Sequence, residues 1–427
     1  MYQKEIKTAL KKILTEARAE AKKLGRKVEV PIIKIVDMLL SYGNQNRASD
    51  VHIEPKEEES LVRFRIQGLL HDVTTLPKDI HEEVVTRIKV LAGLRTDEHH
   101  AAQDGKLTFR TGMELPKERQ EKMDVRVSII PTTHGEKVVM RLLSARVRQY
   151  SLKDMGFSEG DLKKIKKAYS KPYGMIIASG PTGSGKTTTM YAVLKLLNKR
   201  DVNITTIEDP VEYDMGGVNQ IQINPKTGLT FANGLRSIVR QDPDIILVGE
   251  IRDSETASIA VNAAMTGHLV LSTTHANDAA TTLVRLLDMG VEPFLISSSV
   301  NVVVAQRLLR VLCTQCRKQK EVSTAELRKN FPGEYIQKYL GKGAKVKVWI
   351  AQGCSVCQNT GYVDRIGIHE VLLVDDDIRM AVIERKSADS IRNLAIAQGM
   401  VTMLEDGFIK VAKGVTTIEE LMRVVKE

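Results

Sequence analysis

The glycine-rich run Gly180-Pro-Thr-Gly-Ser-Gly-Lys-Thr187 limits the fold more than any other feature of this sequence. The run fits the pattern G-x-x-x-x-G-K-S/T at every fixed position, and it lies between an apolar stretch at 175–178 and a helical pattern at 187–197. Glycine permits the backbone conformations that wrap a loop around phosphate groups with the N–H groups pointing inward. A helix that begins at the end of the loop adds the favourable end of its dipole. The chain is therefore predicted to contain a phosphate-binding loop in an α/β domain.

This loop supplies the residues expected to bind a nucleotide. They are Gly180, Pro181, Thr182, Gly183, Ser184, Gly185, Lys186 and Thr187. Lys186 is expected to reach the β- and γ-phosphates of ATP, and the hydroxyl of Thr187 is placed to hold Mg²⁺. A glycine-rich turn that matches by chance is the alternative, which the flanking strand and helix patterns disfavour.

Acidic side chains at the ends of neighbouring strands are the next requirement for hydrolysis, and two are visible. Glu208 and Glu250 each follow a short apolar strand pattern. The pattern before Glu250 resembles a Walker B strand with Gly249 where an aspartate usually binds magnesium, so it stays open whether Glu208 or Glu250 takes the metal. His275 closes a third strand pattern, from which a side chain can reach the γ-phosphate. Each residue alone fits a structural role at a strand end, but with the loop they predict one hydrolytic site.

Four cysteines form two pairs, and their spacing favours a metal over disulfides. The expected ligands are Cys313, Cys316, Cys354 and Cys357. Two Cys-x-x-Cys hooks can supply four thiolates in a tetrahedron around Zn²⁺ at about 2.3 Å. Because four thiolates leave no position for water, the zinc is predicted to be structural. Free or redox-active thiols are the alternative.

The charge distribution bears on the partners. The net charge is +10, but residues 1–27 hold nine Lys or Arg against three Glu and thus account for +6. Aromatic residues make up only 4% of the chain, which leaves little material for stacking nucleic-acid bases. We therefore expect no nucleic-acid partner. No apolar run reaches the roughly 18 residues of a membrane span, and the charged N-terminus is not a secretory signal, so a cytoplasmic location is expected.

The order of the patterns predicts an α/β fold: a RecA-like P-loop ATPase domain preceded by a small α/β domain, with a four-cysteine zinc insert and a helical C-terminal part. The expected segments are a basic amphipathic helix at 1–29, a small α/β N-terminal domain at 30–144, a linker at 145–160, the RecA-like core at 161–312, the zinc-binding insert at 313–360 and a helical C-terminal subdomain at 361–427. Residues 4–24 read as one helix, which either packs on its own domain or docks on a partner or an acidic lipid surface.

Several longer motifs carry a resemblance to a known family. They are Thr206-Ile-Glu-Asp-Pro-Val-Glu-Tyr213, Leu229-Thr-Phe-Ala-Asn-Gly-Leu-Arg-Ser-Ile-Val-Arg-Gln-Asp-Pro-Asp244, Val248-Gly-Glu-Ile-Arg-Asp253, Gly267-His-Leu-Val-Leu-Ser-Thr-Thr-His275, Ala48-Ser-Asp-Val-His-Ile-Glu-Pro55 and Asp124-Val-Arg-Val-Ser128. With the P-loop, this set closely resembles the GspE/PilB family of secretion ATPases, the motors of type II secretion and type IV pilus assembly. The similarity covers roughly residues 30–427 and is highly specific.

The resemblance implies a homo-hexameric ring in which the smaller domain of one subunit presses on the nucleotide of its neighbour. Carried over by position, Arg126 and Arg141 are the catalytic arginines from that domain, while Arg236, Arg240 and Arg252 support the site from the ATPase domain. It also implies an inner-membrane platform protein of a pilus or secretion system as a partner, with peripheral membrane association through it. Guanidinium groups suit this task because charge accumulates on the transferred phosphoryl group.

Departures from the family pattern concern docking more than hydrolysis. Many members carry a further N-terminal domain, whereas here only the basic helix precedes residue 30. The segment 95–105 lacks the basic residues expected before Gln103-Asp-Gly, and Gln67 replaces an expected aspartate. Retraction motors of the PilT type generally lack the cysteine insert, so its presence favours assembly or export.

Three rival functions remain beside this motor: a nucleic-acid translocase of the RecA-like class, a pilus retraction motor, and a scaffold that binds ATP without turnover. Intact Lys186, Glu208, Glu250 and His275 argue against the scaffold. The sequence leaves open which filament or secretion system is driven, the direction of ring motion, and whether an N-terminal docking domain is naturally absent.

Overall fold

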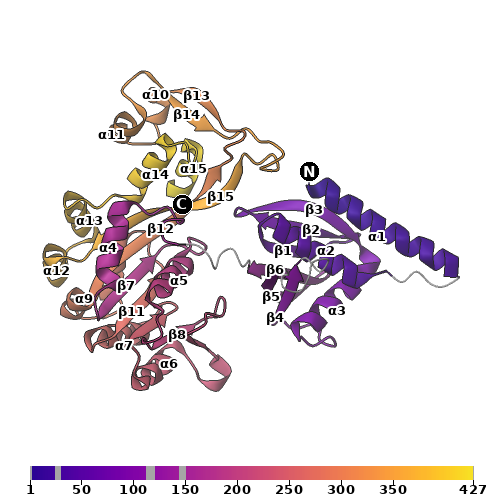
Figure 1. Cartoon of the computed structure of the whole chain (residues 1–427), viewed down its shortest axis with the longest axis horizontal. Helices are drawn as coiled ribbons and strands as arrows, with labels where there is room; N and C mark the ends of the chain where they lie inside the picture. Colours follow the sequence, from indigo (N-terminus) through magenta and orange to yellow (C-terminus); the bar gives the residue numbers. More distant parts are fainter. Residues whose placement is uncertain (1, 25–29, 112–120, 144–150, 427) are drawn as a thin grey trace. The chain divides into compact units, whose positions relative to one another are not determined.

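The chain divides into two compact units, Met1–Gln149 and Tyr150–Glu427 (Figure 1). The computed structural model describes residues 2–24, 30–111, 121–143 and 151–426. Most of the expected linker 145–160 falls at the start of the second unit, where Leu152 and Phe157 are buried in its core. Residues 144–150 lie outside the described residues.

The first unit is an antiparallel sheet with helices on one face. Its elements are α1 (Tyr2–Leu24), α2 (Ile32–Gln45), β1 (Ala48–Pro55), β2 (Glu59–Ile66), β3 (Leu69–Pro77), α3 (His81–Ala92), β4 (Gln103–Thr111), β5 (Glu121–Thr132) and β6 (Gly135–Leu143), with the strands in the order β3-β2-β1-β6-β5-β4. Every neighbouring pair is antiparallel.

Alternation along the strands explains this one-sided arrangement. On β2, Val62 and Phe64 are buried in the apolar core beneath the helices, and Arg63 and Arg65 therefore point to the opposite face. The same alternation on β5 buries Val125 and leaves Arg126 on the face opposite the helices. The sheet thus has an apolar face and a charged face.

The N-terminal helix belongs to this unit. On α1, Ile6, Leu10 and Ala17 are buried, and the helix packs against β3 and α2. The sequence left open whether this helix packs on its own domain or docks on a partner or an acidic lipid surface. The apolar contacts show that it packs on its own domain.

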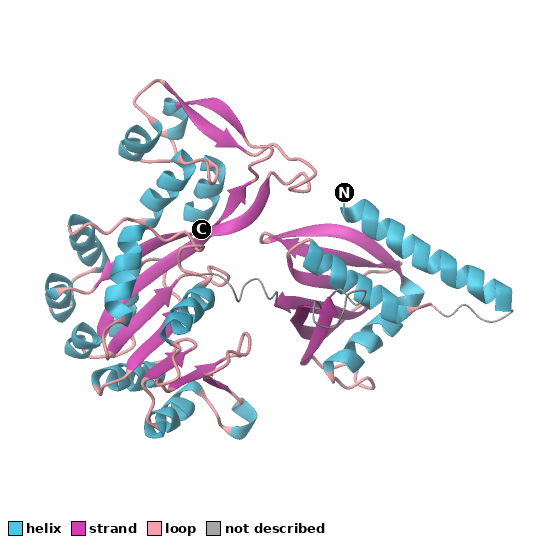
Figure 2. Ribbon diagram, viewed as in Figure 1, coloured by secondary structure: helices cyan, strands magenta, loops and turns pink. Residues whose placement is uncertain are grey.

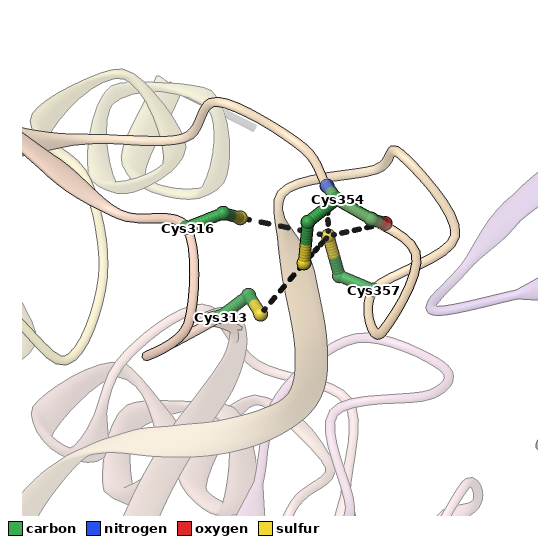
Figure 3. Close-up of side chains that lie close together, drawn as sticks. All are labelled: Cys313, Cys316, Cys354 and Cys357. Carbon is green, nitrogen blue, oxygen red and sulfur yellow. Dashed lines mark hydrogen bonds between the residues drawn. The ribbon is translucent and has the colours of Figure 1, made fainter.

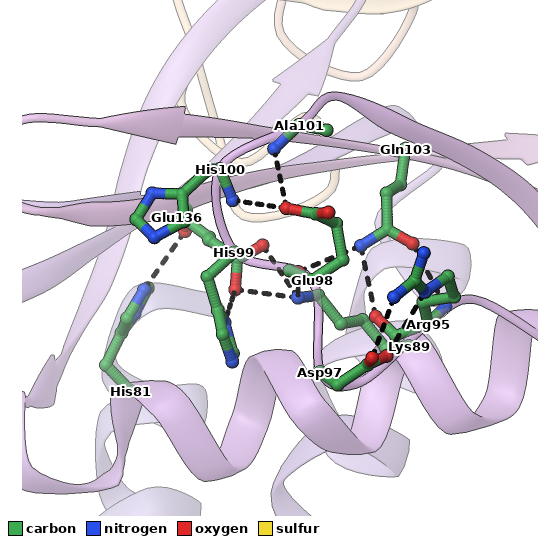
Figure 4. A network of polar contacts seen from close by, with 10 residues as sticks. All are labelled: His81, Lys89, Arg95, Asp97, Glu98, His99, His100, Ala101, Gln103 and Glu136. Atoms are coloured by element: carbon green, nitrogen blue, oxygen red, sulfur yellow. Dashed lines mark hydrogen bonds and ion pairs between the residues drawn. The ribbon is translucent and has the colours of Figure 1, made fainter.

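The segment before Gln103-Asp-Gly is held inside the first unit by a polar network (Figure 4). The fully buried Lys89 of α3 donates to the Glu136 carboxylate at 2.8 Å and to the backbone oxygen of Glu98 at 2.6 Å. Gln103 donates to the same Glu98 oxygen at 3.1 Å, and His99 Nδ1 lies 2.9 Å from Glu136. The loop before Gln103 is therefore held by contacts with α3 and with Glu136 of β6.

The second unit contains a seven-stranded sheet flanked by helices (Figure 2). Its elements are α4 (Glu159–Tyr169), β7 (Gly174–Ser179), α5 (Lys186–Leu197), β8 (Ile204–Glu208), β9 (Asn219–Gln222), α6 (Phe231–Ile238), β10 (Ile245–Val248), α7 (Ser254–Met265), β11 (Leu269–Thr274), α8 (Ala279–Asp288), α9 (Pro293–Ser299), β12 (Val300–Leu312), β13 (Lys318–Ser323), α10 (Thr324–Leu327), α11 (Gly333–Tyr335), β14 (Lys345–Ile350), β15 (Tyr362–Leu373), α12 (Asp376–Ile383), α13 (Ala388–Ala397), α14 (Met403–Ala412) and α15 (Ile418–Lys426).

The strand order is β15-β12-β7-β11-β10-β8-β9, and all neighbours are parallel except β15, which runs antiparallel to β12. Along β7, Met175 and Ile177 join one apolar cluster while Ile176 and Ala178 join another. The sheet is therefore covered on both faces, as its unbroken apolar strands require. The prediction of a mostly parallel α/β sheet is confirmed.

The C-terminal part differs from the prediction in one respect. Residues 361–427 are largely helical, as predicted, through α12 to α15, but Tyr362–Leu373 forms the strand β15 at the edge of the sheet. Residues 366–372 are buried or nearly so without alternation. Such a run is equally typical of a buried helix, so only the pairing with β12 decides its conformation.

Candidate active site and metal centre

The residues predicted for hydrolysis gather at one edge of the second unit's sheet. The parallel register pairs Ser179 with Thr274, and Val248 with both Ser272 and Ile207. The P-loop, Glu208, Glu250 and His275 each lie at or just after the carboxyl end of one of these strands. This is the edge at which ligands bind in open parallel sheets.

Glycine is required in the P-loop for its backbone shape. Gly180, Gly183 and Gly185 have φ angles of 145°, 79° and 92°, which side chains other than glycine rarely adopt. Lys186, the first residue of α5, donates from Nζ to the backbone oxygens of Gly180 at 2.7 Å and Pro181 at 3.1 Å. Burial lowers the pKa of Lys186, and the negative charge of Glu250 opposes that effect. The lysine and this glutamate are therefore electrostatic neighbours.

Gln306 of β12 binds the P-loop and the first turn of α5 through its side chain. No sequence motif indicated this role. The Gln306 side chain is buried, donates from Nε2 to the backbone oxygen of Ser184 at 2.7 Å and accepts from the Thr189 hydroxyl at 2.8 Å. A side chain at position 180 would also collide with the backbone oxygen of Gln306, because a Cβ would lie 2.4 Å from it. The strand β12, packed beside β7, thus fixes both the loop and the first turn of α5.

Glu250 is the centre of a small polar group. Its Oε1 lies 2.6 Å from Arg252 Nη2, and its Oε2 lies 3.3 Å from His275 Nε2. The Glu250 side chain is mostly buried, whereas Arg252 and His275 are partly exposed. The structure therefore brings together three of the predicted residues, from the ends of β10 and β11, beside Lys186.

Glu208 is bound differently, by the protein itself. It accepts hydrogen bonds from the hydroxyl groups of Tyr191 and Thr206, the latter at 2.5 Å, and from the amide of Gln220 at 3.3 Å. Its burial raises the pKa of Glu208, although these donors oppose the effect. Burial and the neighbouring carboxylate also raise the pKa of Tyr191. Glu208 thus ties β8 to α5 and β9, a network that sequence reasoning missed.

The other two predicted arginines of this unit, Arg236 and Arg240, do not contact the group formed by Glu250, Arg252 and His275 among the described residues. Arg236 pairs with Glu255 at 2.5 Å, and Arg240 donates to the backbone oxygen of Arg236 at 3.0 Å. Among the described residues, neither arginine has a hydrogen bond or ion pair with the P-loop, Glu250 or His275.

In the first unit, Arg126 of β5 and Arg141 of β6 lie directly opposite each other in the sheet register. Arg141 donates from Nε to Asp50 Oδ1 at 3.0 Å. The register therefore places two cationic residues next to each other on the face of the sheet opposite the helices.

The four cysteines meet in space, as predicted (Figure 3). All four sulfur atoms lie within 4.8 Å of one another. The backbone N–H groups of Cys354 and Gly361 donate to the Cys357 sulfur at 3.1 and 3.2 Å. Burial alone would raise the pKa of Cys357, but these donors lower it to about 7. Four convergent thiols with such support fit a tetrahedral metal ion.

None of the helices in the described part of the chain combines the length and the apolar character needed to cross a membrane.

The chain was compared with family models, with curated proteins and with solved structures. Residues 26–423 match the family model described as Type II/IV secretion system protein. The chain is 45% identical over 397 residues to the type II secretion system protein HxcR of Pseudomonas aeruginosa, covering 93% of this chain and 78% of HxcR. It is 43% identical over 399 residues to the type II secretion system ATPase E of Vibrio cholerae, covering 93% of this chain and 76% of that protein.

The chain is also 45% identical over 390 residues to the type IV pilus assembly ATPase PilB of Thermus thermophilus, covering 91% of this chain and 42% of PilB. Among solved structures, the ATPase DotB of Legionella pneumophila is similar with a TM-score of 0.65 at 19% identity, over 91% of this chain and 94% of DotB. The pilus retraction motor PilT with bound ADP is similar with a TM-score of 0.62 at 23% identity, over 91% of this chain and 96% of PilT. At these identities the likeness concerns the fold alone.

Proposed function

Because the chain belongs to the Type II/IV secretion system protein family, we propose that it is an ATP hydrolase that works as a homo-hexamer and powers type II-like protein secretion or type IV pilus assembly. The observation that carries the proposal is the convergence of Lys186, Glu250 and His275 at the carboxyl edge of one parallel sheet. Relatives more than 40% identical are named for secretion and for pilus assembly, so the proposal includes both processes.

In the proposed reaction, water attacks the γ-phosphorus of ATP, the bond to the bridging oxygen breaks, and ADP and phosphate leave. The loop N–H groups and Lys186 hold the phosphates, and Glu250 orients the water and accepts its proton. His275 fixes the Glu250 carboxylate through their contact. Thr187 would hold Mg²⁺, which neutralises phosphate charge when bound.

We assign the water to Glu250 and not to Glu208. Glu250 is the acid whose charge acts on Lys186, and its contacts are limited to Arg252 and His275 among the described residues. Glu208 already accepts from three protein donors and is only 2% exposed, which suits an anchor of the sheet.

Charge on the departing phosphate is neutralised by arginines. Arg126 and Arg141 are proposed to act on the nucleotide of a neighbouring subunit, with Arg236, Arg240 and Arg252 supporting the site from its own subunit. Such fingers contribute roughly 10³–10⁵ in rate. The register of Arg126 opposite Arg141 across β5 and β6 puts two cationic residues on one face of the sheet, which supports an anionic ligand for that surface.

The cysteine cluster is proposed to hold a structural Zn²⁺ through Cys313, Cys316, Cys354 and Cys357. The protein is further proposed to be cytoplasmic and to reach the inner membrane through a platform protein of the machine that it drives. Nucleic acid is not among the proposed partners.

Two substitutions test the hydrolytic assignment. Glu250→Gln is expected to keep ATP binding while hydrolysis falls by roughly 10²–10⁴, because only the water loses its proton acceptor. Lys186→Ala is expected to lose nucleotide binding, because it removes the cation that contacts the phosphates. Steady-state hydrolysis and the binding of a fluorescent ATP analogue separate the two effects. Parental turnover by Glu250→Gln would show that this assignment is wrong.

A further inference from the structure

One row of charged side chains crosses five strands of the first unit's sheet on the face opposite its helices. In register order the row is Arg65 (β2), Asp50 (β1), Arg141 (β6), Arg126 (β5) and Lys106 (β4). Like charges directly opposite on neighbouring strands destabilise a sheet. Asp50 is the single carboxylate in the row, and it pairs with the cations on both of its sides, Arg141 and Arg65.

The contacts of Asp50 are specific. Its Oδ1 accepts from Arg141 Nε at 3.0 Å, and its Oδ2 accepts from the Ser49 hydroxyl at 2.8 Å and lies 3.5 Å from Arg65 Nε. Asp50 is only 5% exposed, whereas the Arg141 side chain is 61% exposed. Since the bond to Arg141 uses Nε, neither Nη nitrogen is engaged by the residues that the structure describes, and both can donate to a further acceptor.

We infer that Asp50 is a positioning residue, which fixes the base of the Arg141 side chain so that its guanidinium end faces an incoming phosphate. The inference rests on the proposed function, in which Arg141 acts on a neighbour's nucleotide. An unrestrained arginine loses rotamer freedom when it engages a ligand, and a side chain already held loses less. Small errors in the placement of a catalytic group lower the rate steeply.

The same strand offers a matched control four residues away. Glu54 is equally buried, at 5% exposed, and is paired on the same face with Arg63 at 2.7 Å and Lys137 at 3.1 Å. Glu54 contacts neither Arg126 nor Arg141 among the described ion pairs. A purely structural role of buried carboxylates on β1 would therefore appear in both residues alike.

The experiment compares ATP hydrolysis by hexamers of the 427-residue chain that carry Asp50→Asn, Glu54→Gln, Asp50→Glu, Arg141→Ala or the double change Asp50→Asn/Arg141→Ala. Asp50→Asn is expected to lower kcat about tenfold to a hundredfold with little change in KM, because the arginine engages the transition state more than the substrate. Asp50→Glu is expected to recover part of the loss, since the carboxylate is restored. In the Arg141→Ala background, Asp50→Asn is expected to have no further effect on kcat.

Each other outcome counts against the inference. If Arg141→Ala abolishes turnover while Asp50→Asn matches wild type, Asp50 does not position the arginine and the proposed function stands. Equal losses in Asp50→Asn and Glu54→Gln, with equal falls in melting temperature, would indicate a structural role only. A wild-type rate for Arg141→Ala would overturn the assignment of the finger, and the positioning role with it.

Discussion

Glu420 of α15 links the C-terminal helices to β12, the strand whose Gln306 binds the P-loop. Its carboxylate is fully buried and accepts from Arg310 of β12 through Nη2 at 2.7 Å, Nε at 2.9 Å and the backbone N–H at 3.0 Å. Arg423 donates two further bonds, from Nη2 at 2.7 Å and from Nε at 3.1 Å. Burial alone would raise the pKa of Glu420, but the bonds from Arg423 and Arg310 lower it from 4.5 to about 2.

This pKa sets a magnitude for the contribution. A fall from 4.5 to about 2 corresponds to about 3 kcal/mol of stability at pH 7. Because the pKa is depressed in the folded state, the contribution is complete well above pH 4.5 and is lost as the pH falls toward 2. Linkage gives a loss of about 1 kcal/mol by pH 4 and about 2 kcal/mol by pH 3.

We therefore expect Glu420→Gln to lower the free energy of unfolding by about 3 kcal/mol at pH 7, since Arg310 is then left buried without its counter-ion. The difference from wild type should shrink between pH 5 and pH 3 as linkage requires. Urea unfolding followed by the fluorescence of Trp349, the single tryptophan, measures it in the same unit. Glu419→Gln, an exposed neighbour on α15, is the control. Equal stabilities at pH 7, or a difference that does not change with pH, would refute this reasoning.

Two other predictions follow from the second unit. Purified protein is expected to contain about one zinc per chain, which chelation under denaturing conditions should release. Removal of the zinc should change the fluorescence of Trp349, because Arg317, next to Cys316, stacks on the tryptophan ring at 4.5 Å. Freshly purified, reduced protein that contains no metal would contradict the assignment of the four cysteines as zinc ligands. Gln306→Ala is expected to weaken ATP binding about tenfold, roughly 1.4 kcal/mol, because Ser184 loses the bond that holds the loop in its phosphate-binding shape. Titration with a fluorescent nucleotide checks this against Gln319→Ala on the exposed strand β13. Equal affinities would show that the bond to Ser184 is dispensable.

Much of the fold could be predicted from short sequence patterns, because the interactions behind these patterns are between residues close together in the chain. The P-loop needs glycines at particular turns and a strand and helix beside it, so eight residues predict the start of an α/β domain. Parallel strands bring their carboxyl ends to one edge, which is why Glu250 and His275, 25 residues apart in sequence, lie 3.3 Å apart. The catalytic roles of these residues stay predictions.

The parts that sequence reasoning missed depend on contacts distant along the chain. Asp50 and Arg141 are 91 residues apart, and only the order β1-β6 brings them together. Gln306 reaches Ser184 because β12 inserts beside β7, which no turn or periodicity indicates. The strand β15 has no alternation over residues 367–372, because both faces are buried there. Tertiary pairing decides these features.

The central claim is that each active site combines the P-loop of one subunit with arginines of the next. Mixing Arg126→Ala chains with Lys186→Ala chains tests it most directly. Each variant alone should be inactive, whereas some interfaces of a mixed ring join an intact P-loop to intact arginines, so ATP hydrolysis should partly return. Co-purification through two different tags establishes that the rings are mixed. No recovery in such rings would mean that the arginines act within their own subunit or only stabilise the fold.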